Sequence, residues 1–118
     1  ERLALAIGQI NGCGYCLSAH TFLGKARGKL SDAEIAANRN GGSTDAKANA
    51  AVAFAVKVAK ARGQVTEADI ADVKAAGYSD AQVIEIVAHV ALNTLTNYIN
   101  EVFKTDIDFP VVDVKVAA

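Results

Sequence analysis

Proline is nearly absent from this chain, whose one proline is Pro110. Because proline is the strongest helix breaker, every residue before position 110 is free to be helical. Apolar residues recur at helical spacing, as in Leu3, Ile7 and Ile10. We therefore predict an all-α fold of about six helices.

Candidate capping residues divide the chain into these helices. Capping boxes begin at Ser31, Thr66 and Ser79, because each side chain can accept a hydrogen bond from an otherwise unpaired amide. Ser43 or Thr44 can cap a further long helix. The expected helices cover residues 1–10 and 14–28, begin after 31, 44 and 66, and end with a long helix over about 80–103. After residue 104 an alternating pattern that includes Pro110 predicts an extended arm, packed on the domain surface or on a neighbouring subunit.

Length and composition narrow the class of protein. The chain has 118 residues, 52% of them hydrophobic and 21% charged, with a net charge of -1. We expect one domain over residues 1–118, with an incomplete N-terminus because the chain starts at Glu1 and has no methionine. The composition is not that of a disordered or nucleic-acid-binding protein. The chain has no apolar run of about 18 residues, so the sequence predicts no membrane span.

The only cysteines, Cys13 and Cys16, are three residues apart and are followed by His20. Cα atoms at this spacing on a first helical turn fall within the roughly 4.4 to 6.8 Å that a disulfide requires. Asn11-Gly12 indicates a break between helices, so the cysteines should open the next helix, where thiolates are stabilised. His20 lies four residues after Cys16, on the same helical face, and can exchange a proton with it. The pattern favours a thiol oxidoreductase in a reducing, cytoplasmic compartment.

Two other interpretations of the cysteines are weaker. A static bridge over so short a loop would remove little entropy from the unfolded chain. Cys13, Cys16, His20 and Glu1 could also form a four-ligand zinc set, but structural zinc sites usually have two ligand pairs, and glutamate is a poor member. We therefore expect no metal and no cofactor.

A polar line crosses the long last helix, which is otherwise apolar on more than one face. Its residues recur every four positions: Glu85, His89, Asn93 and Asn97. Buried polar groups need partners, so this line should face a pocket or another chain. A hydrogen-bonded network that fixes helix register is the plainer explanation, and Glu85 and His89 are second-tier candidates for catalysis.

One acid, two cysteines and one histidine in this register resemble the core motif of the alkylhydroperoxidase D-like family, within the carboxymuconolactone decarboxylase superfamily. These residues are Glu1, Cys13, Cys16 and His20. The segments similar to the peroxidase-related members of the family are Lys29–Ile35, His89–Asn100 and Asp106–Pro110. The resemblance covers nearly the whole chain.

The resemblance implies an all-helical fold that assembles into homo-oligomers, trimers or hexamers, and that reduces hydroperoxides with a dithiol. Cys16 would attack the peroxide, and Cys13 would resolve the sulfenic acid into a disulfide. Glu1 and His20 would form a proton relay, through a water where needed. An external dithiol, such as a lipoyl-type carrier, would reopen the disulfide.

One residue departs from the family pattern. Its best-known relatives have histidine immediately before the second cysteine, where this chain has Tyr15. A tyrosine with an ordinary pKa of about 10 cannot supply imidazole chemistry there, so Tyr15 is a second-tier site residue. Two alternative functions stay open: a metal- or redox-responsive binding subunit that uses the same cysteines, and a dithiol-independent decarboxylase or lyase that works through Glu85 and His89.

Overall fold

The computed structural model describes residues 1–115 and confirms the predicted all-α fold class. That part of the chain contains six helices and no strand. The helices are α1 (Arg2–Asn11), α2 (Gly14–Ala26), α3 (Asp32–Arg39), α4 (Ala46–Lys60), α5 (Glu67–Ala75) and α6 (Asp80–Val102). The last three residues of the predicted 1–118 domain lie outside the described residues.

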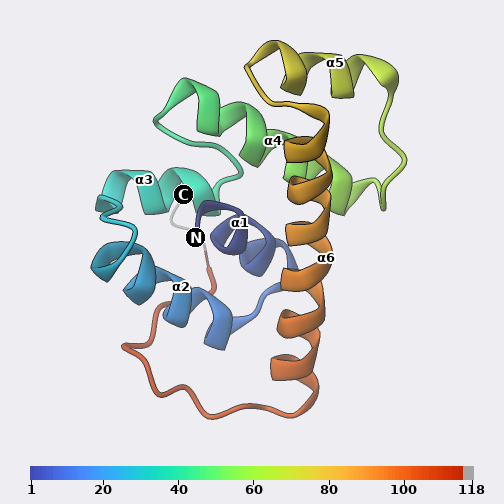
Figure 1. Cartoon of the computed structure of the whole chain (residues 1–118). Coiled ribbons are helices and arrows are strands. Elements are labelled where there is room, and N and C mark those ends of the chain that lie inside the picture. The colour runs from blue at the N-terminus through green and yellow to red at the C-terminus, as the bar shows by residue number, and fades with distance from the viewer. Residues whose placement is uncertain (116–118) are drawn as a thin grey trace.

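Helix α1 lies at the centre of the fold and packs against α2, α3, α4 and α6 (Figure 1). The long α6 runs along one side of the molecule and contacts α1, α2, α4 and α5. This arrangement places the α1–α2 turn, which carries the two cysteines, beside the C-terminal half of α6. None of the helices described is both long and apolar enough to cross a bilayer.

Two groups of buried side chains hold α1 in place. Leu5, Leu17 and Ile35 join α1 to α2 and α3. The larger group joins α1 to α4, α5 and α6, and its largest members are Ile7, Phe54, Val58, Val73 and Ile86. Fully burying one such side chain stabilises the fold by about 1.5 to 3 kcal/mol. Helix α1 is therefore anchored from both sides of the domain, and α2 is anchored against α1 and α3 through Leu17.

Most of the predicted helix starts are confirmed, with two differences. Thr66 and Ser79 form complete capping boxes. Ser31 accepts a hydrogen bond from the Glu34 amide, but the Glu34 carboxylate turns away into a tertiary network, so that box is only half formed. Helix α4 is capped by Asp45 and not by Ser43 or Thr44.

The extended arm predicted after residue 104 is confirmed for residues 105–115, which run beneath α2 and return toward α1 and α3 (Figure 1). The Val112 amide donates a hydrogen bond to Ser18 Oγ in α2, and Gln9 Nε2 in α1 donates one to the Val114 carbonyl. The arm thus packs on the helices of its own chain, the first of the two places that the sequence predicted.

Candidate active site

The turn between α1 and α2 is formed by one left-handed residue, Gly12, with φ of 65°. Glycine occupies this region without steric cost, whereas a side chain there is strained. The Gly12 amide donates to the Gln9 carbonyl, and the Cys13 amide donates to the Gly8 carbonyl, which satisfies the end of α1. The predicted break at Asn11-Gly12 is therefore real, and it places Cys13 directly before α2.

Cys13 and Cys16 form a disulfide across the first turn of α2, with their Cα atoms 5.2 Å apart. Cys13 is the N-cap residue, and its Sγ accepts a hydrogen bond from the Cys16 amide at 3.1 Å. Cys13 is completely buried, while Cys16 retains 3% of its surface exposed. A disulfide at a helix N-terminus is an arrangement that supports reversible thiol chemistry, because that position stabilises the thiolate of the reduced form.

Glu1 and His20 meet one helical turn along α2 from Cys16. His20 Nδ1 and Glu1 Oε2 are 2.8 Å apart, and both side chains are partly exposed. Glu1 is the N-cap residue of α1 but forms no capping hydrogen bond with its side chain, because its carboxylate engages the imidazole. Such a contact orients an imidazole and selects which of its nitrogens carries a proton.

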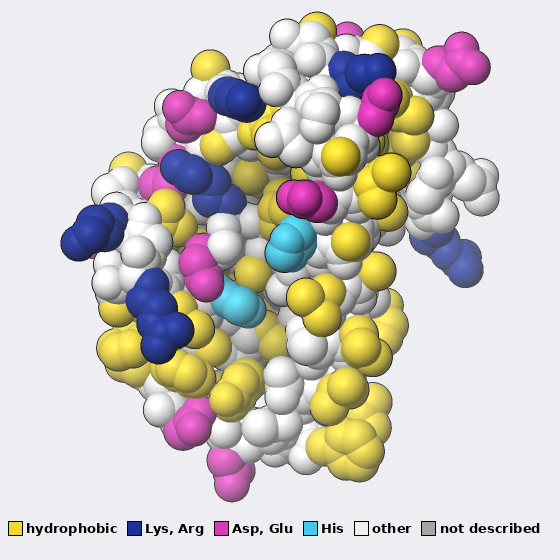
Figure 2. All heavy atoms as spheres, viewed as in Figure 1, with side chains coloured by type: hydrophobic (Ala, Val, Ile, Leu, Met, Phe, Trp, Pro, Cys, Tyr) yellow, Lys and Arg dark blue, Asp and Glu magenta, His cyan; other side chains and the backbone are white. Residues whose placement is uncertain are grey.

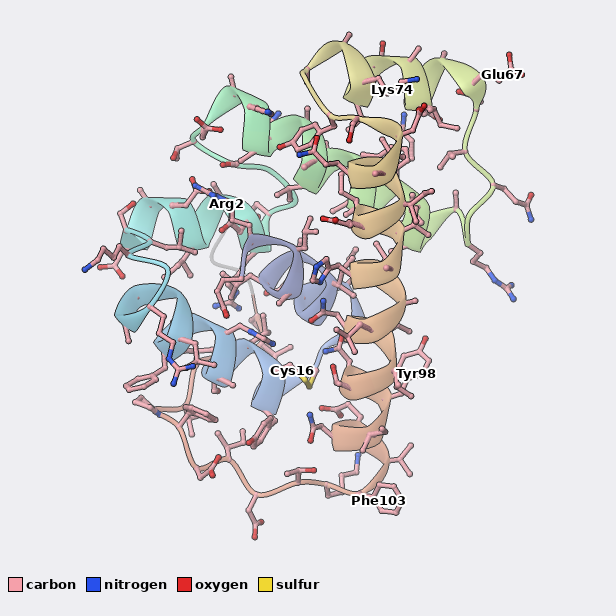
Figure 3. The ribbon with its side chains drawn as sticks, in the orientation of Figure 1. Arg2, Cys16, Glu67, Lys74, Tyr98 and Phe103 are labelled. Atoms are coloured by element: carbon pink, nitrogen blue, oxygen red, sulfur yellow. A yellow bond between two sulfur atoms is a disulfide. The ribbon has the colours of Figure 1, made fainter. Side chains whose placement is uncertain are left out.

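The described residues show no direct hydrogen bond between His20 and either sulfur. The side-chain hydrogen bond to Cys16 Sγ comes instead from Asn100 Nδ2 in α6, at 3.5 Å. Figure 3 shows the sulfur of Cys16 on the side of α2 that faces α6. Sequence reasoning missed Asn100, although it lies only three residues beyond Asn97, the last residue of the polar line of α6.

Tyr15 lies away from the Glu1–His20 pair. Its ring packs edge-on against Phe109 of the arm, with ring centroids 5.8 Å apart. Loss of hydration, and then the neighbouring Asp108 carboxylate, raise the pKa of Tyr15 above its ordinary value. Tyr15 therefore stays protonated near neutral pH and docks the arm onto α2, which explains why an aromatic residue fits at this position.

Glu85 and His89 of the predicted polar line are exposed, whereas Asn93 and Asn97 are buried. Both histidines of the chain appear on the face of the molecule that Figure 2 shows. His89 and Asn93 share a shallow pocket of about 210 Å³ with Glu1. The pocket brings α6 next to the Glu1 end of the site, while Glu85 does not line it.

The carboxylate of Glu34 is buried and binds Arg2, the residue that follows Glu1 in the chain. Glu34 is only 4% exposed and accepts hydrogen bonds from Arg2 Nε at 2.7 Å, from Asn38 Nδ2 at 2.8 Å and from Ser43 Oγ at 2.6 Å. Figure 3 shows Arg2 reaching from the start of α1 toward α3. Because Arg2 follows Glu1 in the chain, this network fixes the residue that meets His20. The sequence suggested Glu34 only as half of a capping box.

In residues 1–115 no three His, Cys, Asp or Glu side chains are grouped so that they could hold a metal ion. The four candidate zinc ligands divide into two pairs, the disulfide and the Glu1–His20 contact. The cysteines of this state are bonded to each other, so neither offers a thiolate to a metal.

The first half of the chain matches a known protein family. The model of the carboxymuconolactone decarboxylase family matches residues 1–61, just over half of the 118 residues. The matched part contains Glu1, Cys13, Cys16 and His20, and it ends where α4 ends. No match to the chain is found among curated proteins. From the match over residues 1–61, the chain belongs to the carboxymuconolactone decarboxylase family.

Proposed function

We propose that this chain is a thiol-dependent peroxidase that reduces hydroperoxides through reversible oxidation of Cys13 and Cys16. The observation that carries the proposal is the 2.8 Å contact between His20 and Glu1, one helical turn from a disulfide at a helix start. Nucleophile, base and the group that orients the base are the three parts of an activated thiol site. Membership of the carboxymuconolactone decarboxylase family supports the proposal.

The proposed cycle begins with the reduced dithiol. The Cys16 thiolate attacks the terminal oxygen of a hydroperoxide, the O–O bond breaks, and the alkoxide leaves as an alcohol after it accepts a proton from His20. Sulfur is oxidised to sulfenic acid, and the peroxide is reduced by two electrons. The Cys13 thiol then displaces hydroxide from this sulfenic acid, which releases water and forms the disulfide that the structure contains.

An external dithiol must complete the cycle. Its thiolate attacks the disulfide, and a second exchange step releases the reduced Cys13 and Cys16 together with the oxidised carrier. A lipoyl-type carrier in the cytoplasm is the reductant that we propose. Because both cysteines are buried, the peroxide and the carrier require a local opening between α2 and α6. Local opening of this kind has a low free energy at the edge of a fold.

If His20 relays protons as proposed, its replacement should greatly slow the reaction with peroxide. We expect His20→Ala to slow peroxide-dependent loss of thiols about 100-fold at neutral pH, because a positioned base contributes at least this factor. The rate is measured by mixing pre-reduced protein with a series of hydroperoxides and counting free thiols over time. Lys25→Ala is the matched control, since Lys25 is an exposed residue of the same helix and pairs only with Asp32 among the described residues. A His20→Ala rate equal to the control rate would rule out the relay.

We also propose that the chain forms a homo-oligomer through the outer face of α6. Between Glu85 and Glu101 this helix has no Asp, Glu, Lys or Arg, and Figure 3 shows Tyr98 pointing away from the other helices. The exposed large apolar residues of the α6 face are Ile84, Val87, Leu92, Leu95, Tyr98, Ile99 and Val102, and Figure 2 shows hydrophobic side chains along this flank. An apolar face of this extent marks an interaction surface. A second copy of the same uncharged face is complementary to it.

Leu95→Glu tests this assembly, because Leu95 is 58% exposed near the middle of the α6 face. We expect this variant to shift the protein toward monomer in sedimentation experiments, since association would bury an unpaired carboxylate. Val111→Glu is the control, because Val111 is 72% exposed but lies on the arm. Equal molar masses for wild type and Leu95→Glu would show that the α6 face does not carry the assembly.

A further inference from the structure

Each sulfur of the disulfide has its own hydrogen-bond donor. Cys13 Sγ accepts from the Cys16 amide at 3.1 Å, and Cys16 Sγ accepts from Asn100 Nδ2 at 3.5 Å. A disulfide sulfur is a weak acceptor, whereas a thiolate carries a full negative charge and accepts strongly. Both hydrogen bonds would therefore become stronger when the disulfide is reduced and the accepting cysteine ionises.

The charged groups around Cys16 do not supply this stabilisation directly. His20 is paired with Glu1 on one side, and the Asp108 carboxylate faces Tyr15 on the arm side of α2. In the part of the chain that the structure describes, no lysine or arginine hydrogen-bonds to either sulfur. The contact from α6 is thus a neutral amide, and it reaches the cysteine that the proposed reaction uses as its nucleophile.

The fold holds the Asn100 amide in place through the preceding turn of α6. Asn97 is completely buried, and its Oδ1 accepts a hydrogen bond from Asn11 Nδ2 at 3.0 Å. Asn11 is the last residue of α1 and stands two residues before Cys13. This hydrogen bond therefore fixes the register of α6 against the cysteine turn, and Asn100 follows one turn later beside Cys16.

We propose that Asn100 is a catalytic residue whose amide donates a hydrogen bond to the Cys16 thiolate and so favours the ionised nucleophile. The inference rests on the proposed function for the identity of the reaction, but thiolate stabilisation can be measured without a peroxide. Asn100 lies outside the part of the chain that the family model matches. The assignment therefore comes from the contact between α6 and α2 alone.

The test uses a Cys13→Ser background, in which Cys16 is the only thiol and no disulfide forms. Asn100→Asp keeps the side-chain shape but replaces the donor with an anion. We expect alkylation of Cys16 by iodoacetamide to slow about tenfold at neutral pH, which corresponds to a shift of one unit in the pKa of the thiol. At about pH 10, where both proteins are ionised, the variant should react as fast as its parent or slightly faster, because a more basic thiolate is a better nucleophile.

Two further variants make the result specific. Asn100→Leu removes the donor without adding a charge and should slow alkylation at neutral pH by a smaller factor, again with convergence at high pH. Asn100→Leu also replaces Asn100→Asp as the test variant if Asn100→Asp does not fold. Thr96→Asp adds the same charge one turn earlier on α6, at an exposed residue whose hydroxyl bonds only to its own helix. This control should alkylate at the rate of its parent.

The outcomes separate this inference from the proposed function. Equal neutral-pH rates for Asn100→Asp and its parent would overturn the role of Asn100, and so would a slowing by the same factor at both pH values, which is the result of altered access alone. Failure of both the Cys13→Ser and the Cys16→Ser proteins to react with any hydroperoxide would instead refute the peroxidase. The alkylation profiles would still decide whether Asn100 stabilises the thiolate.

Discussion

Cys16→Ser is expected to abolish the hydroperoxide reaction, with a loss of rate on the order of 10⁴ or more, as found when a nucleophile is removed. A serine hydroxyl at position 16 is a far weaker nucleophile toward peroxide oxygen than a thiolate. The remaining thiol, Cys13, is completely buried, and within residues 1–115 neither Asn100 nor His20 hydrogen-bonds to it. Thiol loss and peroxide consumption, each measured after full reduction of the protein, should both fall to the background of a cysteine-free sample.

Cys13→Ser is the matched variant and should behave differently. Serine is a good N-cap residue, so α2 keeps its start, and Cys16 should still reduce one equivalent of hydroperoxide. Without a resolving thiol the product is a sulfenic acid at Cys16, which a dimedone-type probe traps. If Cys13→Ser were inactive and Cys16→Ser active, the two roles would be exchanged, because the helix N-terminus would then activate Cys13.

Glu34→Ala should give the largest loss of stability of any single change near the site, on the order of 3 to 5 kcal/mol. The carboxylate is the shared acceptor for Arg2, Asn38, Ser43 and Thr44, so its removal leaves several donors without a partner. Urea denaturation measures the effect. Glu67→Ala at the exposed start of α5 is the control and should change the free energy of unfolding by no more than about 0.5 kcal/mol. A loss for Glu34→Ala as small as that of the control would contradict the account of the network.

The same carboxylate makes stability depend on pH. Burial alone would raise the pKa of Glu34, but hydrogen bonds from Ser43, Thr44, Arg2 and Asn38 outweigh it and hold the pKa well below the ordinary value of 4.5. Because the folded state binds this proton less tightly than the unfolded state, the stabilisation is complete above the ordinary value and is lost as the pH falls below it. The difference in unfolding free energy between wild type and Glu34→Ala should therefore shrink on acidification.

Local signals in the sequence were sufficient to predict most of the fold. Thr66 and Ser79 cap their helices with side chains that act within one turn, so no tertiary information was needed. The box at Ser31 is incomplete because the Glu34 carboxylate meets donors on four residues of α1, α3 and the following loop, and a local sequence pattern does not reveal this long-range competition. The cap of α4 was misplaced by one to two residues, since Ser43 and Thr44 serve the same network and leave Asp45 as the cap.

The candidate site was predictable where its residues share one helix. Cys13, Cys16 and His20 are fixed relative to one another by α2, and the disulfide formed as their spacing indicated. Asn100 was not predictable, because its contact with Cys16 depends on how α6 crosses α2, which the sequence separation of 84 residues does not disclose. The position of Tyr15 likewise depends on the arm, where Phe109 meets its ring.

Titration of the fully reduced wild-type protein with one equivalent of an organic hydroperoxide, followed by intact-mass analysis and peptide mapping, tests whether Cys13 and Cys16 reduce peroxides. The proposed cycle predicts loss of both thiols, a mass lower by two hydrogen atoms, a Cys13–Cys16 bridge and one equivalent of alcohol. Peroxide that persists beside two free thiols, or an oxidised Cys16 that never bonds to Cys13, would contradict it.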